Sequence, residues 1–466
     1  MSIMLKDNSP VPADYEARCQ AIQRLADRGQ CSLIDLRGRA ANRPPNRPQI
    51  FCRDGSGNWR TGNLIGVFEY RAGDGGLETV VIGDRFGPEM VAGGGTEGEF
   101  LSFFSWVMLE QCWDETPLWL LNESRSRGEA DIFDQVLVLR LAAQLERAWK
   151  KGRLRFYRTF SRYDCRLQGQ LDLPRKIRRS MGLEDGNMAC RVREYSENNL
   201  YGQLFFQACL QAERRHPELM RQLKRRMPGF RMARQALEQQ AAAWGWGARD
   251  FRSLLNGTKQ KITNPLYRDY ETLRTVARAV LRRSSSSSYS EAGAPLVTGI
   301  FLDISALWED YLARAVFSGL SSQPLKQGNN GGDIGILDGM LNIRPDFWWK
   351  DGGRVLDAKY RPVWSRFLTP SSSGEDRKDI QEDVYQVLAY MLALDCPRGG
   401  VIFPVKSGCS GGAPSYRKTT AVKGRTEREF WLIPFFVPQI ADYADFYSAL
   451  LAEAGQVQRA VELFLD

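Results

Sequence analysis

Two aspartates and a lysine that could carry out hydrolysis lie in one segment, residues 341–361, which reads LNIRPDFWWKDGGRVLDAKYR. Asp346 follows a proline, and a single residue separates Asp357 from Lys359. Carboxylate oxygens bind hard divalent cations, and a bound cation can polarise a water molecule beside it. The trio therefore predicts metal-assisted hydrolysis. The competing interpretation is a hairpin whose surface carboxylates form a local salt bridge with the lysine.

The alternation of side chains along this segment predicts how the trio converges. We expect a β-hairpin with strands at 341–349 and 354–361, joined by a Lys-Asp-Gly-Gly turn. Because successive side chains of a strand point to opposite faces, Asp357 and Lys359 share one face. Pairing of the two strands can bring the carboxylate of Asp346 to the same side.

Helices on either side of the hairpin supply further polar groups. In ALWEDYLARAVFSGL, Glu309 lies on the apolar stripe of the helix, so we expect it to point toward the core. An acid in that position needs a partner or a metal ion. In the downstream helix DIQEDVYQVLAYMLAL, Gln386 and Tyr390 are four residues apart and lie on one face. These groups favour a site over a surface salt bridge.

Imidazole chemistry is nearly excluded, because the chain of 466 residues contains a single histidine, His216. Ser/His/Asp triads, paired-histidine zinc sites and facial-triad iron centres all need histidine as base or ligand. His216 itself precedes a proline and is expected at an exposed helix end. The scattered cysteines form no Cys-x-x-Cys pair, which predicts reduced thiols in a cytoplasmic protein. No apolar run has the length of a signal peptide core or a membrane span.

Basic residues are concentrated in the middle of the chain, although the net charge is only +9. Residues 147–283 hold about 31 Lys and Arg against about 12 Asp and Glu, so the remainder is net acidic. Aromatic residues are interleaved with the basic clusters, such as RKIRR at 175–179. This segment could bind DNA through phosphate contacts, or it could consist of solvated helix faces.

Length and patterning predict a multidomain α/β protein in three parts. Residues 1–130 contain short β-prone runs broken by glycines, which predict a β-rich N-terminal domain. Residues 131–292 show helical periodicity, form the basic region and end in a Ser-rich stretch. Residues 293–466 return to a mixed α/β pattern. Since no G-x-x-x-x-G-K-[ST] phosphate loop occurs, any associated nucleotide hydrolysis must come from a partner.

The trio and its flanking helices resemble the core of PD-(D/E)xK nucleases, with Pro345-Asp346 on one strand and Asp357-Ala358-Lys359 on the next. Over about residues 60–405 the chain also resembles the McrC family, the nuclease subunit of McrBC-type restriction systems. The segments that carry this resemblance, in the family's order, are TGNLIGVFEY, VVIGDRFGPEM, KKGRLRFYRTFSRYDCRLQGQLDLPRKIRRSM, MACRVREYSENNLYGQLFF, NPLYRDYETLRTVARAVL, GIFLDISALWEDYL, LDAKYR, DVYQVLAYM and GGVIFP. The sequence RLQG at 166–169 departs from the family's Arg-x-Leu-x-Gly pattern.

The resemblance implies a C-terminal PD-(D/E)xK restriction-endonuclease-like α/β domain with a mixed central sheet. It implies cleavage of double-stranded DNA with Mg²⁺, or with Mn²⁺ as a substitute. It also implies that the N-terminal domain contacts a hexameric McrB-like AAA+ GTPase and stimulates its hydrolysis, and that the middle region contacts DNA or bridges the other parts. The pair Gln386 and Tyr390 would position the site or the DNA backbone.

The same resemblance implies roles for the charged residues. Asp346 and Asp357 would be metal ligands, joined by Glu309 directly or through water. Lys359 would orient the attacking water and stabilise charge on the scissile phosphate. Phosphodiester hydrolysis needs charge neutralisation and an oriented water more than a dedicated base, so a site without imidazole suits it.

Two other functions are compatible with parts of the pattern. A catalytically silent adaptor could bind DNA and activate a motor NTPase while keeping the nuclease-like domain for architecture. The intact set of Asp346, Asp357 and Lys359 argues against that role. A glycoside hydrolase could also use a carboxylate pair without histidine, but its neutral substrate would give the basic middle region no function.

Overall fold

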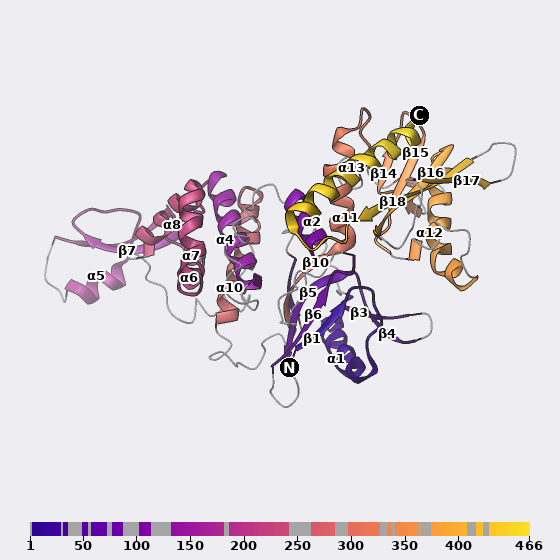
Figure 1. Cartoon of the computed structure of the whole chain (residues 1–466). Helices are drawn as coiled ribbons and strands as arrows, with labels where there is room; N and C mark the ends of the chain where they lie inside the picture. The colour runs from indigo at the N-terminus through magenta and orange to yellow at the C-terminus, as the bar shows by residue number, and fades with distance from the viewer. Residues whose placement is uncertain are drawn as a thin grey trace. The chain divides into compact units, whose positions relative to one another are not determined.

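The chain folds into two compact units in the computed structural model (Figure 1). The first unit comprises Met1–Arg37, Ala41–Asp114 and Pro295–Asp466, and the second comprises Gly38–Ala40 and Glu115–Ala294. The functional division into three parts stays a prediction. The structure describes residues 2–28, 31–35, 49–54, 57–71, 77–86, 102–112, 132–180, 186–241, 262–284, 297–326, 334–336, 341–361, 363–364, 374–407, 416–422 and 428–466.

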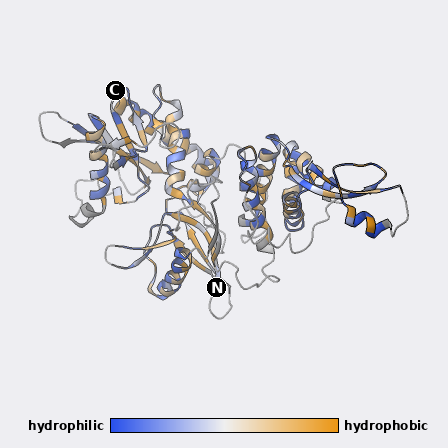
Figure 2. Ribbon diagram, turned by 180° about the vertical axis from the view of Figure 1, so that it is seen from behind, coloured by the Kyte–Doolittle hydropathy of each residue, from blue (hydrophilic) through white to orange (hydrophobic). Residues whose placement is uncertain are grey.

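A five-stranded sheet with the order β1-β6-β5-β10-β2 forms the N-terminal part of the first unit. Helix α1 (Glu16–Asp27) packs its buried apolar side chains against this sheet. Figure 2 shows that α1 carries both hydrophilic and hydrophobic residues, as expected for a helix with one buried face. The strand bounds are β1 (Ser2–Lys6), β2 (Cys31–Asp35), β5 (Leu64–Arg71), β6 (Leu77–Gly83) and β10 (Val297–Asp303), and a small hairpin adds β3 (Phe51–Arg53) and β4 (Trp59–Thr61).

Strand β10 departs from the predicted boundary between the N-terminal and C-terminal parts. The sequence predicts that residues 293–466 form one domain, but β10 lies between β5 and β2, antiparallel to the first and parallel to the second. Val297 and Phe301 join the core beneath α1. Gly299 permits the close approach of β5, because a Cβ there would lie 2.5 Å from the carbonyl oxygen of Val67.

A six-stranded mixed sheet forms the C-terminal part of the first unit, in the order β11-β14-β15-β16-β18-β17. Strands β15, β16 and β18 run parallel, and the other pairings are antiparallel. Strands β16 and β18 are buried along almost their whole length, which is typical of strands covered on both faces. The bounds are β11 (Leu325–Lys326), β14 (Phe347–Trp349), β15 (Arg354–Ala358), β16 (Arg398–Lys406), β17 (Arg417–Val422) and β18 (Arg428–Val437).

Helices cover both faces of this sheet. On one face, α12 (Gly374–Ala393) packs Val387 and Met391 against β15 and β16. On the other face, aromatic side chains of two helices surround Phe435 of β18. The helices on that face are α2 (Phe103–Cys112), α11 (Ile304–Tyr311), which continues as a π-helical turn (Leu312–Val316), and α13 (Tyr443–Leu465).

The predicted hairpin is present but shorter. Strands β14 and β15 pair around a turn in which Gly353 has a φ of +59°, a left-handed conformation that glycine adopts readily. The prediction of one strand over 341–349 is wrong, because β13 (Leu341–Ile343) pairs instead with β12 (Ile334–Ile336) in a separate sheet. Pro345 stands at the break, and its nitrogen has no hydrogen to donate to a ladder.

Helices and a small antiparallel sheet make up the second unit. In α6, the Asn199 side chain caps the helix by accepting a hydrogen bond of 2.9 Å from Gly202 N. The helix bounds are α4 (Ile132–Lys150), α5 (Leu173–Ser180), α6 (Leu200–Arg215), α7 (Pro217–Arg226), α8 (Pro228–Ala241) and α10 (Arg268–Ser284). The strands are β7 (Phe156–Asp164), β8 (Gln170–Leu171) and β9 (Met188–Ser196), in the order β7-β9-β8.

Two predictions for this region need correction. The sequence predicts a helical region, but β7 and β9 form a long antiparallel pair. Along most of β7 and β9 the side chains are exposed or half-buried, and within these two strands only Ala189 and Cys190 are buried, so they lack the continuous apolar face by which a strand is usually identified. His216 is buried rather than exposed, because it sits between α6 and α7 with Nε2 3.9 Å from Asp134 Oδ2. No helix in the described ranges is long and apolar enough to cross a membrane.

Candidate active site

The end of strand β15 brings the two predicted aspartates together. The break at Pro345 releases Asp346 from the ladder, and its Oδ2 accepts a hydrogen bond of 2.8 Å from the backbone N–H of Ala358. Asp357, one residue earlier on β15, is buried. The backbone of Lys359 continues the sheet by donating to Ile402 O at 2.9 Å. Both aspartates therefore lie at the C-terminal end of β15, in the middle of the strand order and beside the parallel strand β16.

Three side-chain oxygens surround the ammonium group of Lys359. Its Nζ lies 2.7 Å from Asp357 Oδ2 and 2.8 Å from Gln386 Oε1. The third oxygen is Asp383 Oδ1, at 3.2 Å. The ammonium donates a hydrogen bond to Gln386 and lies between two carboxylates, which together fix the position of the charge. The structure thus brings Asp357 and Lys359 into contact and places Asp346 against the backbone between them, while the catalytic roles of the three stay a prediction.

The acidic groups crowd one another. Burial raises the pKa of the Asp346 carboxyl well above its usual range, and the nearby charges of Asp357 and Glu309 raise it further. Burial disfavours the charged form of Lys359, but the carboxylates of Asp357 and Asp383 outweigh burial and raise the pKa of the lysine. The site therefore gathers negative charge close to a fixed ammonium group, and additional positive charge would stabilise it.

The donor set suits a hard cation at the two aspartates. Asp357 Oδ2 is buried and accepts no hydrogen bond of normal geometry within the described part of the chain; its close neighbour is the Lys359 ammonium. Crowded carboxylate oxygens are the ligands that Mg²⁺ prefers. The half-buried Glu309 is near enough to act on Asp346 electrostatically. However, no group of three His, Cys, Asp or Glu side chains among the described residues is placed to hold a metal ion.

The predicted Gln/Tyr pair of α12 contacts the site. Gln386 Nε2 donates to the hydroxyl of Tyr390 at 2.6 Å, and Gln386 Oε1 accepts from Lys359. The Tyr390 hydroxyl donates to the backbone oxygen of Arg344 at 3.3 Å. The pair therefore connects the lysine to the segment that precedes Asp346.

Sequence reasoning missed Asp383. Its carboxylate is buried and contacts Lys359, the Arg361 guanidinium at 3.4 Å and Trp364 Nε1 at 3.4 Å. The sequence feature that could have indicated Asp383 is its position three residues before Gln386, which places both side chains on one side of the helix. The same helix carries the exposed Glu382, and the sequence alone does not separate the two acids.

Two solved structures contain chains that match this one. A chain of the refined half-complex from the tetradecameric assembly of Thermococcus gammatolerans McrB AAA+ hexamers with bound McrC matches with a TM-score of 0.50 and 15% identity, over 99% of both chains. A chain of the cryo-EM structure of the Thermococcus gammatolerans McrBC complex matches with a TM-score of 0.34 and 13% identity, over 67% of this chain and 86% of that one. No curated protein matches.

One family, described as McrBC 5-methylcytosine restriction system component, matches residues 61–404. The match begins at the last residue of β4 and ends within β16, so it takes in the hairpin, Glu309 and the Gln386–Tyr390 pair. Because it covers well over half of the sequence, the chain belongs to the family of McrBC restriction system components.

Proposed function

We propose that this chain is the DNA-cleaving subunit of a McrBC-type restriction system and that its six-stranded sheet is a PD-(D/E)xK nuclease core. The observation that carries the proposal is the convergence of Asp346, Asp357 and Lys359 beside Gln386 at the C-terminal end of β15. The strand order and the parallel pairing of β15 and β16 support it. The substrate is double-stranded DNA.

Asp346 and Asp357 would hold Mg²⁺, or Mn²⁺ in its place, with Glu309 contributing directly or through water. When bound, the ion would supply positive charge to the scissile phosphate and its attacking water. Lys359 would contribute a second, fixed positive charge at the same phosphate. Gln386 and Asp383 would keep the ammonium in place, because each offers it an oxygen acceptor.

The partner proposed for this chain is a McrB-like AAA+ GTPase hexamer. One chain of a solved assembly of McrB AAA+ hexamers with bound McrC is similar to this chain in fold. The sequence contains no phosphate-binding loop, so the nucleotide-hydrolysing site would be in that partner. The family description points to DNA that contains 5-methylcytosine as the substrate.

The proposal is tested with methylated plasmid DNA, a McrB-like GTPase, GTP and Mg²⁺. We expect linear products that appear only when this chain is present and that disappear when EDTA removes the metal. Unmethylated plasmid of the same sequence is the matched substrate control. If the complete mixture hydrolyses GTP but leaves methylated DNA intact, the chain is a silent adaptor and the nuclease proposal is wrong.

Replacing Asp383 should slow the same reaction. Asp383→Leu removes one of the three oxygens around Lys359, so we expect cleavage about 10–100-fold slower than that of the wild type, as for other residues that orient a catalytic group. Asp383→Asn keeps the oxygen acceptor and should retain more activity than Asp383→Leu. Single-turnover cleavage with saturating partner measures the effect.

Glu382→Gln is the matched control for this prediction, because Glu382 is an exposed acid on the same helix. It should cut at the wild-type rate. Equal rates for Asp383→Leu and Glu382→Gln would show that Asp383 does not position the lysine.

A further inference from the structure

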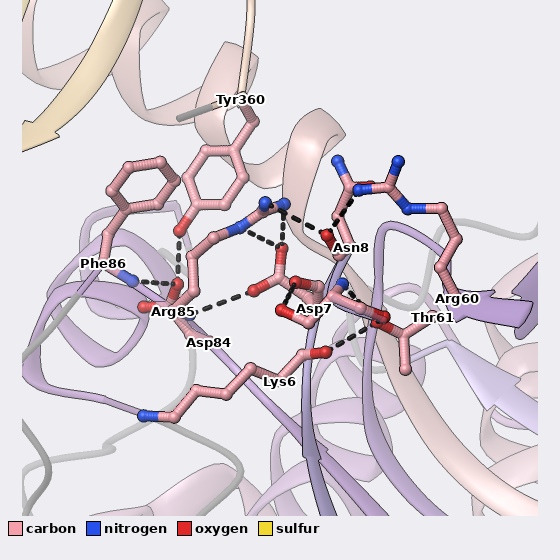
Figure 3. Close-up of polar contacts among 10 residues, drawn as sticks. Lys6, Asp7, Asn8, Arg60, Thr61, Asp84, Arg85, Phe86 and Tyr360 are labelled. Carbon is pink, nitrogen blue, oxygen red and sulfur yellow. Dashed lines mark hydrogen bonds and ion pairs between the residues drawn. The ribbon is translucent and has the colours of Figure 1, made fainter. Parts of the chain in front are cut away.

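Tyr360 lies directly after Lys359 but faces the opposite side of the sheet. Lys359 contacts Asp357 and two residues of α12, whereas the Tyr360 side chain is buried among groups that lie on the other face. Its hydroxyl donates a hydrogen bond of 2.5 Å to Asp84 Oδ1, and Figure 3 shows the ring directed at the turn that contains Asp84. That turn follows strand β6 of the N-terminal sheet.

The acceptor of this hydrogen bond is held rigidly. Asp84 Oδ1 also accepts from the backbone N–H of Phe86 at 3.1 Å, and Asp84 Oδ2 accepts from Ser102 Oγ. The next residue, Arg85, forms a buried ion pair with Asp7 at 2.7 Å, drawn beside Asp84 in Figure 3. Asp7 follows β1, so the turn is tied to two strands of the N-terminal sheet.

The ring of Tyr360 packs against aromatic rings of the N-terminal turn, α2 and α11. It packs edge-on against Phe86, with ring centroids 4.8 Å apart, and stacks on Phe104 of α2 at 6.4 Å. It also lies 6.3 Å from the ring of Trp308, the residue before Glu309 in α11. One side chain therefore contacts the N-terminal turn, α2 and α11 while its backbone continues from the predicted catalytic lysine.

The chemistry of the hydroxyl fixes the direction of the hydrogen bond. Burial and the carboxylates of Asp84 and Asp7 raise the pKa of Tyr360 well above its usual value, so the hydroxyl stays protonated and donates. A buried hydroxyl aimed at a carboxylate makes a charge-assisted bond, which is stronger than a neutral one. Such a bond can fix the position of the segment after β15 that contains Lys359 and Tyr360.

We propose that Tyr360 is a positioning residue for Lys359, and that its hydrogen bond to Asp84 makes the geometry of the nuclease site depend on the N-terminal sheet. The inference rests on the proposed function. A shift of the turn at Asp84 would move the strand end that carries Lys359, and small displacements of a catalytic group are costly for rate. The N-terminal sheet would then be part of the cutting machinery without touching DNA at the site.

Tyr360→Phe tests the proposal, because it removes only the hydroxyl and leaves the ring in its packing. We expect kcat for cleavage of methylated DNA, measured with partner, GTP and Mg²⁺, to fall about 10–100-fold. The KM for DNA and the amount of partner complex should stay within about twofold, since a residue that acts on the lysine alone does not alter binding. Urea unfolding of each variant confirms that rates are compared for folded protein.

Variants of Asp84 and of Ser102 separate positioning from general stability. Ser102→Ala removes a donor from Asp84 Oδ2 but leaves Oδ1, the oxygen that accepts from Tyr360, held by the backbone N–H of Phe86, so it should lose stability but cut at nearly the wild-type rate. Asp84→Asn keeps the oxygen that accepts from Tyr360 and should also cut at nearly the wild-type rate, whereas Asp84→Ala should be as slow as Tyr360→Phe. The double variant Tyr360→Phe/Asp84→Ala should be no slower than either single variant, because both remove one interaction.

The outcomes distinguish the inference from the function on which it rests. Wild-type rates for Tyr360→Phe, or equal losses in Ser102→Ala and Tyr360→Phe, would overturn the positioning role and leave the nuclease proposal standing. Absence of cleavage by the wild-type protein would overturn the proposed function and the positioning role with it.

Discussion

Asp357→Asn is expected to cut DNA about a thousandfold more slowly than the wild type, with partner, GTP and Mg²⁺ present. The substitution keeps the shape of a buried side chain but removes the charge that would hold the metal ion. Lys359 retains Gln386 and Asp383 as acceptors, so the fold around the site should persist. Gel analysis of cleavage products, together with partner binding by size-exclusion chromatography, measures both parts of the prediction.

Asp351→Asn is the matched control, because Asp351 is an exposed aspartate in the turn of the same hairpin. It should cut normally. Lys359→Ala should be as inactive as Asp357→Asn but less stable, since it leaves Asp357 and Asp383 buried without their shared cation. Full cleavage by Asp357→Asn would refute the assignment of the site.

The largest effect on stability is expected for Arg85→Ala. The Arg85 side chain makes two hydrogen bonds to Asp7 Oδ2, and its backbone N–H donates to Asp7 Oδ1 at 3.0 Å. The Asp7 side chain is fully buried, and that of Arg85 is 11% exposed. Removing one partner of a buried ion pair typically costs about 3–5 kcal/mol. Urea unfolding followed by tryptophan fluorescence measures the loss of stability.

The loss of stability caused by Arg85→Ala should increase with pH. Burial raises the pKa of Asp7 to about 6 from its ordinary value of 3.8, an effect that Arg85 opposes. The folded state therefore binds a proton more readily than the unfolded state, and the free energy of unfolding falls as pH rises from about 4 to about 6. Without Arg85 the folded pKa rises further, so the window of falling stability extends to higher pH. Arg85→Ala should be more destabilising at pH 8 than at pH 5.

A control for this prediction replaces both partners. Asp7→Asn/Arg85→Met leaves no unpaired charge in the core and should be more stable than Arg85→Ala at pH 8. Its stability should also lose the pH dependence that belongs to Asp7. Equal destabilisation by Arg85→Ala at pH 5 and pH 8 would contradict the account.

The hairpin and its charged residues could be predicted from the sequence because strand periodicity is local. Alternation put Asp357 and Lys359 on one face, and helix spacing put Gln386 above Tyr390. Glu309 follows the same logic, although the structure does not bring it into a three-ligand group. Asp383 could not be selected, because its burial depends on how α12 lies against the sheet and Glu382 beside it has the same chemistry.

Long-range pairing set the limit of the fold prediction. The partners of β10 are β2 and β5, which lie more than 200 residues earlier in the sequence, and no local pattern specifies such partners. The sheet of β7 and β9 was hidden for another reason. Its strands mix arginine with aromatic and small polar residues and bury only Ala189 and Cys190, so the helical segments around them dominate the periodicity.

The position of β10 also has a consequence for how the protein is made. This strand lies inside the five-stranded sheet, between β5 and β2, yet it emerges from the ribosome only after the whole of Glu115–Ala294 has been synthesised. Until then β5 and β2 have no neighbour between them, and unpaired strand edges are prone to aggregate. The second unit can fold through its own helices while the five-stranded sheet of the first unit is still incomplete. Synthesis from the N-terminus therefore leaves the first-translated sheet incomplete until Glu115–Ala294 has been made, and this interval is when the nascent chain most needs a chaperone.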